Sequence, residues 1–299
     1  MSSPSTPTRK FYDLRDGRIS AVHFGDVSAP LKLVMLNANG FNGYSYKTIL
    51  EPLGVHAAAL DLRGHGMSEL PTDVAGLKNW HIFRDDVAEF FGRYIDSPVV
   101  LAGHSYGAVT GILAMPLIKE KTSGYVGFDP VLVPGLFRAI NRMPGGRAYM
   151  KARLPIARNA GRRKSSFESF EAAFNRYQNR GAFRGFSDEA LRDYLTGGLI
   201  ADGEGVKLAC DPLWEQAVFT AQGHNVFKAA PSLPRNNSHI TFAGKYGAVS
   251  FKSGRRAMAK IIGAENVVFD KNLAHMFPMH APDYASGRIL EVIKKALLV

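Results

Sequence analysis

One serine of this chain lies in a pattern that could expose and activate its hydroxyl group. Gly103-His104-Ser105-Tyr106-Gly107 reads G-x-S-x-G, between a short β-branched apolar stretch at 97–102 and an apolar, helix-compatible stretch at 108–115. On a tight turn from strand to helix such a serine points outward, and the flanking glycines avoid collisions with the neighbouring strand and helix. The helix N-terminus supplies free N–H groups that can stabilise an oxyanion. The pattern therefore predicts a nucleophile at Ser105.

The segments on both sides of this turn alternate between strand-like and helix-like patterns. One helical pattern covers residues 78–94, and residues 281–299 are predicted to form a closing amphipathic helix. Such alternation predicts a mostly parallel sheet that is covered by helices. The strands predicted from short apolar runs are 19–24, 31–36, 57–62, 99–102, 125–128, 240–243 and 267–269.

The stretch from about Pro134 to Arg235 breaks this alternation, with aromatic-rich helical patterns between Gly and Pro turns and no convincing strand. We predict that residues 135–235 form a helical cap, inserted into an α/β core made of residues 1–134 and 236–299. Such a cap would cover the carboxyl edge of the sheet, where ligands bind in open α/β folds. Its aromatic residues either form the core of the cap or line an apolar substrate pocket.

Four motifs in register resemble the α/β-hydrolase superfamily, and the resemblance covers nearly the whole chain. Leu36–Phe41 looks like the oxyanion loop, with Asn39 in the place of a usual histidine; Asp61–Ser68 matches Asp-x-x-Gly-x-Gly-x-Ser; and the serine turn follows. The fourth motif, Ala274–Pro278, follows the last predicted strand. The resemblance implies an α/β-hydrolase fold: a mostly parallel eight-stranded sheet, flanking helices and an inserted helical cap.

The resemblance also assigns roles to residues of these motifs. A serine hydroxyl needs a base to remove its proton, and His275 is expected to be that base because it follows the last strand. The backbone N–H groups of Phe41 and Tyr106 are the expected oxyanion hole. Asn39 and His104 are the residues expected to contact substrate, although Asn39 could equally serve the turn alone.

The carboxylate that should orient His275 is displaced from its common position. Glycine stands there, in Gly244-Lys245-Tyr246-Gly247, and no Asp or Glu occurs between Glu215 and Glu265. Some α/β-hydrolases, including certain haloalkane dehalogenases, carry the acid after the strand that follows the nucleophile helix. Asp129 matches that position, 24 residues after the serine. We predict that Asp129 is the orienting acid, with Asp270 and Asp202 as the reserve candidates.

Serine at position 105 restricts the chemistry. Epoxide hydrolases and haloalkane dehalogenases attack with an aspartate, and an ether formed on serine would offer water no carbonyl. Serine suits acyl transfer through an acyl-enzyme. The sequence predicts a hydrolase of ester-type bonds (carboxylic ester, lipid ester, lactone or thioester), whose apolar insertion favours an apolar acyl or aromatic group. The alternatives are a carbon–carbon bond hydrolase with the same triad, or a non-catalytic ligand-binding protein on this fold.

Composition and charge limit the partners. The formal net charge is +11, and residues 145–164 hold seven basic side chains and no acidic one. This charge forms a solvated face, or it attracts anionic lipid surfaces or acidic substrates. No nucleic-acid motif accompanies it, and no metal-ligand cluster, P-loop or dinucleotide fingerprint implies a metal or cofactor. Residues 1–10 have no apolar signal and are predicted to be a frayed tail, so a cytoplasmic location is expected.

Overall fold

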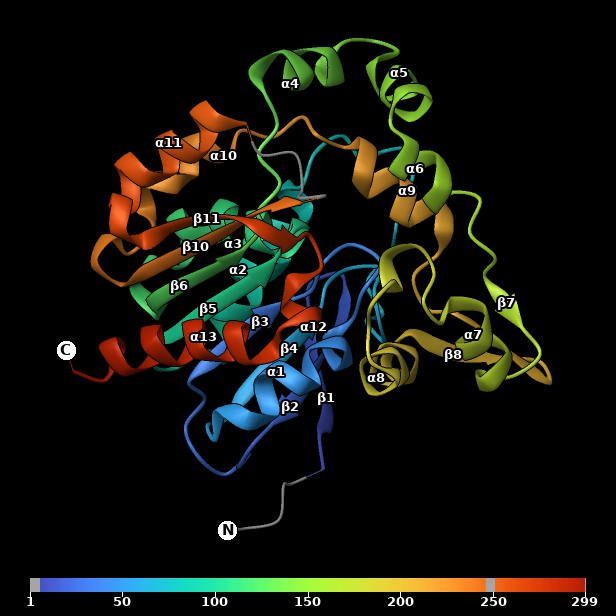
Figure 1. The fold of residues 1–299 in the computed structure, drawn as a ribbon, viewed down its shortest axis with the longest axis horizontal. Coiled ribbons are helices and arrows are strands. Elements are labelled where there is room, and N and C mark those ends of the chain that lie inside the picture. Colours follow the sequence, from blue (N-terminus) through green and yellow to red (C-terminus); the bar gives the residue numbers. More distant parts are fainter. Residues whose placement is uncertain (1–5, 246–250, 299) are drawn as a thin grey trace.

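One large sheet forms the centre of the molecule in the computed structural model, which describes residues 6–245 and 251–298 (Figure 1). Its eight strands are β1 (Thr8–Leu14), β2 (Gly17–Phe24), β3 (Leu33–Leu36), β4 (Ala57–Asp61), β5 (Val99–His104), β6 (Thr122–Phe128), β10 (Ser238–Lys245) and β11 (Val267–Ala274). They lie in the order β1-β2-β4-β3-β5-β6-β10-β11. Only β1 to β2 and β2 to β4 pair antiparallel, so the predicted mostly parallel sheet is confirmed.

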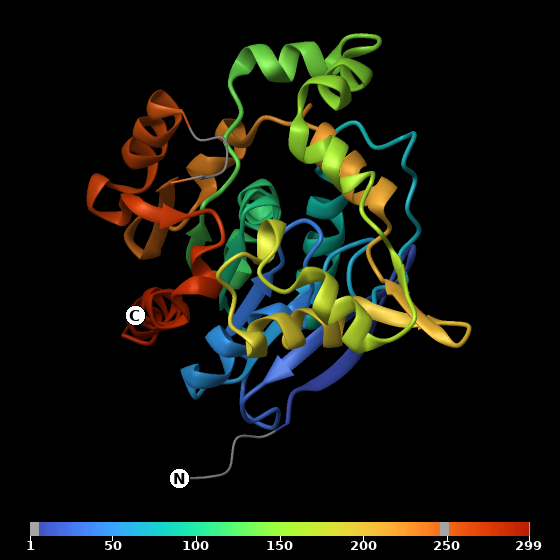
Figure 2. The same cartoon turned by 45° about the vertical axis from the view of Figure 1, so that its right-hand side comes forward.

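Helices cover both faces of this sheet (Figures 1 and 2). Alternate residues of β3 show why, because Val34 and Leu36 belong to one apolar core and Leu33 and Met35 to the other. The first core includes α2 (His81–Tyr94), α3 (Tyr106–Ile118), α10 (Val226–Ala229) and α11 (Lys252–Ile262). The second includes α1 (Lys47–Leu50), α12 (Phe277–His280) and α13 (Pro282–Ala296).

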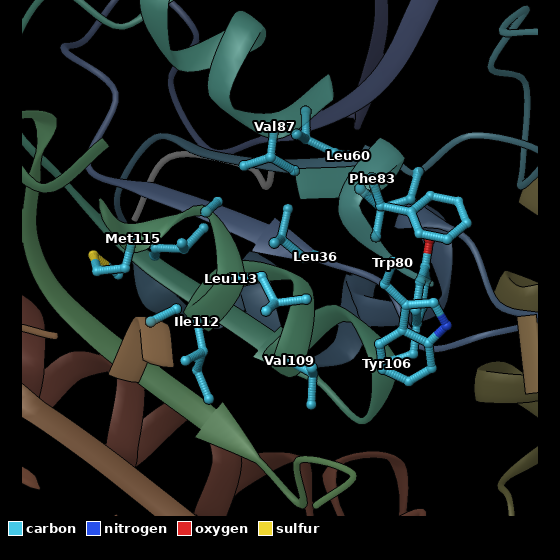
Figure 3. Packing of buried hydrophobic residues seen from close by; sticks show 14 of the residues in the cluster. Leu36, Leu60, Trp80, Phe83, Val87, Tyr106, Val109, Ile112, Leu113 and Met115 are labelled. Atoms are coloured by element: carbon cyan, nitrogen blue, oxygen red, sulfur yellow. The ribbon is translucent and has the colours of Figure 1, made fainter. Parts of the chain in front are cut away.

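Helix α3, which follows the predicted nucleophile, is buried on nearly all sides. A helix that is apolar all round belongs in a protein interior rather than on a surface. Figure 3 shows its side chains packed among those of the sheet and of α2. This packing fixes the N-terminal end of α3, where Ser105 stands. The labelled members of the cluster are Leu36, Leu60, Trp80, Phe83, Val87, Tyr106, Val109, Ile112, Leu113 and Met115.

The stretch predicted to form a helical cap lies between β6 and β10. The expectation that this stretch has no strand is wrong, since a small antiparallel sheet lies within it. Its strands have only two to four residues, and β8 and β9 meet at a tight turn where Gly203 has φ 60°, so no run long enough to signal a strand exists. The elements are α4 (Gly135–Arg142), α5 (Gly146–Arg153), α6 (Pro155–Ala160), β7 (Ser166–Phe167), α7 (Phe170–Tyr177), α8 (Asp188–Gly198), β8 (Leu199–Asp202), β9 (Gly205–Leu208) and α9 (Pro212–Thr220).

Two further details differ from expectation. Thr8–Lys10, expected in a frayed tail, belong to β1, which pairs with β2 from Thr8↔His23 to Leu14↔Gly17. Strand β1 is an edge strand with mostly exposed or half-exposed residues, so it lacks the apolar run of a buried strand. Helix α10 falls inside the stretch assigned to the cap, yet its Val226 packs in the same core as α3.

Five buried histidines make the stability of this fold dependent on pH. Burial, the leading cause in each, lowers the pKa of His23, His65 and His239 to about 4 and that of His104 and His224 to about 3. Below about pH 6.5 the unfolded chain therefore binds more protons than the folded one, and stability falls as the pH falls. Each such group contributes up to about 1.4 kcal/mol per pH unit between 6.5 and its folded pKa.

We therefore expect the urea-unfolding free energy to fall steeply between pH 6.5 and pH 5. His224→Phe retains an aromatic ring beside Trp80, whose ring lies 4.4 Å away, and removes one buried histidine. This variant should lose up to about 1.4 kcal/mol per pH unit less than the wild type over that range. The exposed His280 provides the matched control, His280→Gln. If the unfolding free energies of the wild type and His224→Phe fell equally steeply with pH, the buried His224 would not contribute to the pH dependence.

Candidate active site

The turn between β5 and α3 holds Ser105 in a backbone conformation that residues other than glycine seldom adopt, with φ 57° and ψ −116°. A Cβ atom at Gly103 would lie 2.6 Å from the Ala108 nitrogen, and one at Gly107 would lie 2.4 Å from the Leu36 carbonyl oxygen. Both distances are too short for a side chain. The two glycines of the G-x-S-x-G pattern are thus required by close contact with the following helix and with β3.

A continuous chain of hydrogen bonds starts at the serine hydroxyl. The Ser105 Oγ lies 3.0 Å from Nε2 of His275, and Nδ1 of His275 lies 2.6 Å from Oδ2 of Asp129. The Asp129 carboxylate is fully buried, and its Oδ1 accepts a 3.0 Å hydrogen bond from the Ala243 N–H. A carboxylate at Nδ1 leaves Nε2 free to accept the serine proton. The three side chains come from the ends of β5, β6 and β11.

Parallel pairing of β6 with β10 explains the displaced carboxylate. Asp129 follows β6 with φ 43°, and its own N–H donates to the Thr241 carbonyl at 2.7 Å. The N–H of Ala243 then fixes the carboxylate, so β10 supplies backbone support for an acid carried by its neighbour. The glycine at the common acid position, Gly247, lies outside the described residues.

The two reserve acids have other partners. The Asp270 carboxylate accepts a hydrogen bond from the N–H of Asn272 at 2.8 Å, and Asp202 pairs with Lys207 at 3.1 Å. Neither makes a hydrogen bond with His275 among those of the described residues, whereas Asp129 does.

The His104 side chain contacts the backbone of His275 and is shielded from solvent. Its side chain is fully buried, its Nε2–H donates to the His275 carbonyl at 3.0 Å, and its Nδ1 accepts from the Tyr46 hydroxyl at 3.2 Å. Burial, and then the charge of the nearby His275 ring, lower the pKa of His104 to about 3, in agreement with a neutral ring. The expected substrate contact of His104 is therefore replaced by a structural one.

Two buried side chains, Asn37 and Tyr46, hold the loop after β3 in place. The Asn37 amide donates to the carbonyls of Ala38 and Phe41 at 2.8 and 2.9 Å, and the Tyr46 hydroxyl accepts from the Ala38 N–H at 2.8 Å. The Phe41 N–H donates to the Ala38 carbonyl at 3.0 Å across a turn in which Gly40 has φ 78°. Tyr106 is the first residue of α3, so its N–H has no acceptor inside the helix.

A cavity of about 610 Å³ opens over Ser105 and His275, between the sheet and the cap elements. Asn39 and Phe41 line it, and the Asn39 amide also donates to the Glu215 carbonyl at 3.0 Å. The other lining residues are Ala38, Ile156, Asn159, Ala160, Arg163, Arg176, Tyr177, Arg180, Gly181, Ala182, Phe183, Glu215, Phe219 and Met276.

Comparison with known proteins shows the family of this chain. A sequence model described as "Alpha/beta hydrolase family" matches residues 33–284. The chain belongs to the alpha/beta hydrolase family. No curated protein matches this alpha/beta hydrolase in sequence.

Solved structures share the fold over nearly the whole chain. An E-2-(acetamidomethylene)succinate hydrolase is 15% identical, with a TM-score of 0.77 over 97% of this chain and 100% of that one. The thioesterase domain from the curacin biosynthetic pathway is also 15% identical, with a TM-score of 0.74 over 96% and 100%. An M. tuberculosis esterase is 18% identical, with a TM-score of 0.68 over 98% and 92%. At these identities the likeness concerns the fold.

The Asp61–Ser68 motif of this alpha/beta hydrolase has a structural role. The Asp61 carboxylate accepts hydrogen bonds from the N–H groups of Gly43 and Met67 at 2.7 and 3.0 Å and pairs with Arg9. A Cβ atom at Gly66 would lie 2.2 Å from this carboxylate, which explains the glycine. The motif therefore joins the loop after β4 to the β1 strand and to the loop after β3.

Sequence reasoning missed several residues that shape the site. Asn37 and Tyr46 hold the oxyanion loop, and Glu215 enters the cavity from α9. Glu215 is far from the loop in sequence and its importance depends on how the cap folds, so only the internal position of Asn37 in the loop motif offered a signal. Within residues 6–245 and 251–298, no helix could cross a bilayer and no group of three His, Cys, Asp or Glu side chains could hold a metal ion.

Proposed function

We propose that this alpha/beta hydrolase cleaves carboxylic ester-type bonds (esters, lipid esters, lactones or thioesters) through an acyl-enzyme on Ser105. One observation carries the proposal: the serine, histidine and aspartate form a hydrogen-bonded chain whose serine faces a cavity. That geometry suits nucleophilic acyl transfer, in which a base activates the hydroxyl and a carboxylate orients the base. An esterase and a thioesterase among the similar structures agree with this chemistry.

In the first half-reaction, Ser105 Oγ attacks the carbonyl carbon while its proton moves to Nε2 of His275. The negative charge passes to the carbonyl oxygen, where the Tyr106 N–H and the Phe41 N–H would donate to it. To do so, the Phe41 N–H would either form a bifurcated hydrogen bond or break its present hydrogen bond to the Ala38 carbonyl. Asp129 stabilises the imidazolium that forms. Collapse expels the alcohol or thiol, which takes the proton from His275.

In the second half-reaction, water attacks the acyl-enzyme. His275 Nε2 accepts a proton from that water, the oxyanion forms again, and Ser105 leaves with the proton. The carboxylic acid product and the free serine result. The apolar side chains of the cavity, Phe41, Phe183, Phe219, Ile156 and Met276, favour an acyl or aromatic group as the portion bound during both steps.

A series of p-nitrophenyl esters of increasing chain length tests this function. We expect turnover with an optimum at a chain length that the cavity of about 610 Å³ can enclose, followed by a fall for longer chains. If no ester is hydrolysed, ester cleavage fails. A β-diketone substrate then tests the carbon–carbon hydrolase alternative, and lack of both activities would favour a non-catalytic ligand-binding protein.

The exposed side chains of α4–α6 support a peripheral contact with anionic membranes, one of the two interpretations of the basic charge at residues 145–164. The three helices carry six basic residues and no acidic one: Arg138, Arg142, Arg147, Lys151, Arg153 and Arg158. Large apolar side chains stand exposed among them: Leu136 is 70% exposed and Met143 63%. Exposed apolar side chains interspersed with Arg and Lys are typical of helices that bind in the headgroup region. Ile156 of α6 is 53% exposed and also lines the cavity.

We expect the protein to sediment with vesicles that contain about 30% phosphatidylserine and not with phosphatidylcholine alone. Binding should weaken at about 0.5 M salt because screening shortens the range of charge attraction. The double variant Leu136→Ser/Met143→Ser should bind about tenfold more weakly. Leu117→Ser, at a residue 60% exposed on α3, is the matched control. Equal binding to both vesicle types would contradict the membrane contact.

A further inference from the structure

The cavity over Ser105 carries more positive than negative charge. Its lining includes three arginines, Arg163, Arg176 and Arg180, and one carboxylate, Glu215. In a cavity that is otherwise rich in aromatic side chains, such an excess of cationic groups calls for an explanation.

Arg163 is already fully engaged by the protein. Its guanidinium lies 3.1 Å from the Glu215 carboxylate, donates to the Tyr177 hydroxyl at 3.0 Å and also contacts the Tyr194 hydroxyl. The aromatic rings of Tyr177 and Phe183 lie 4.8 and 5.6 Å from it. Arg163 and Glu215 therefore neutralise each other and join α7 and α8 to α9, which leaves the other two arginines as the net charge of the cavity.

Arg176 and Arg180 lie four residues apart, at the end of α7 and just after it, and both are exposed. In the part of the chain that the structure describes, neither side chain forms a hydrogen bond or ion pair. The acidic groups of neighbouring helices have other partners: Glu171 pairs with Arg192 at 2.6 Å, and Asp188 accepts from Gln178 at 2.9 Å. Both arginines therefore line the cavity without a compensating carboxylate among the described residues.

We propose that Arg176 and Arg180 bind an anionic group of the substrate, so that the substrate is an ester whose apolar body carries a carboxylate or phosphate. Guanidinium groups recognise both anions through paired, charge-assisted hydrogen bonds. The ester carbonyl would lie at Ser105, the apolar body against Phe183 and Tyr177, and the anion at the exposed arginines. The proposal rests on the proposed ester hydrolysis and adds a substrate class to it.

Paired esters of equal length test this inference. The p-nitrophenyl monoesters of adipic and suberic acid end in a carboxylate, whereas hexanoate and octanoate esters end in a methyl group. We expect Arg176→Gln/Arg180→Gln to lower kcat/KM for the carboxylate-ended esters about tenfold, chiefly through KM. The same variant should change kcat/KM for the methyl-ended esters less than twofold. The single variants should show intermediate losses, which keeps the test valid if the double variant folds poorly.

Arg184→Gln is the matched control, because Arg184 is exposed in the same segment but does not line the cavity. It should leave both ester types unchanged. Inhibition of hexanoate ester hydrolysis by suberate and by phenyl phosphate distinguishes a carboxylate preference from a phosphate preference. The inference would be overturned if the double variant and the wild type had the same ratio of kcat/KM for carboxylate-ended esters to kcat/KM for methyl-ended esters.

A binding measurement separates this inference from the proposed function. Calorimetric titration of suberate monomethyl ester into Ser105→Ala, with and without Arg176→Gln/Arg180→Gln, requires no turnover. Arginine-dependent binding without hydrolysis by the wild type would refute the proposed function and leave the anion site standing. Hydrolysis of methyl-ended esters with no arginine-dependent binding would support the proposed function and refute the anion site.

Discussion

Ser105→Ala is expected to lower kcat for p-nitrophenyl esters about 10⁴–10⁶-fold. The alanine has no nucleophile, and the residual rate would come from the oxyanion hole and from substrate binding alone. Because the side chain is small and the neighbouring glycines set the turn, the backbone at this position should persist. Single-turnover kinetics with purified protein measures the loss.

Thermal unfolding of Ser105→Ala within about 3 °C of the wild type would show that the loss is chemical rather than structural. The exposed Ser28 provides the matched substitution, Ser28→Ala, which should retain full activity. A Ser105→Ala protein that keeps more than about a tenth of the wild-type kcat would show that another group attacks the ester.

Asp129→Asn should lower kcat about 10³–10⁴-fold while the fold persists. An asparagine oxygen can still accept the hydrogen bond from the Ala243 N–H, so its NH₂ group would face Nδ1 of His275. Nδ1 would then be the acceptor and Nε2 would carry the proton, which removes the base that Ser105 needs. The buried negative charge that stabilises the imidazolium is lost as well.

The reserve acids supply the controls for this substitution. Asp270→Asn and Asp202→Asn change carboxylates that bind Asn272 and Lys207, so each should retain activity within about twofold. The outcome that would remove Asp129 from the mechanism is a full-length, folded Asp129→Asn enzyme with wild-type kcat.

The arrangement of the core follows from local patterns in the sequence. Buried parallel strands such as β5 are continuous apolar runs, and the glycines around Ser105 reflect contacts within a few ångströms of the turn. The G-x-S-x-G pattern therefore carries its own structural context. The edge strand β1 shows the opposite case, because its residues are mostly exposed or half-exposed and it is joined to β2 by a turn at residues 15–16.

The hydrogen-bonded chain was predictable in part, and the cavity was not. Asp129 could be inferred because a residue at the end of β6 must lie at the same sheet edge as Ser105. The buried position of His104 depends on how Tyr46 and the His275 loop pack around it, which adjacent residues do not signal. The arginines of the cap reach the cavity only through the folding of elements with short, irregular sequence patterns.

Reaction with a fluorophosphonate, followed by intact mass and peptide mapping, tests the central claim most directly. Such a probe phosphonylates a serine that a neighbouring base has activated, and it requires no knowledge of the natural substrate. The hydrogen bond between Ser105 and His275 predicts one adduct per chain on Ser105, no adduct in Ser105→Ala and a much slower reaction in His275→Ala. An adduct on another residue, or none under conditions that label a known serine esterase completely, would contradict it.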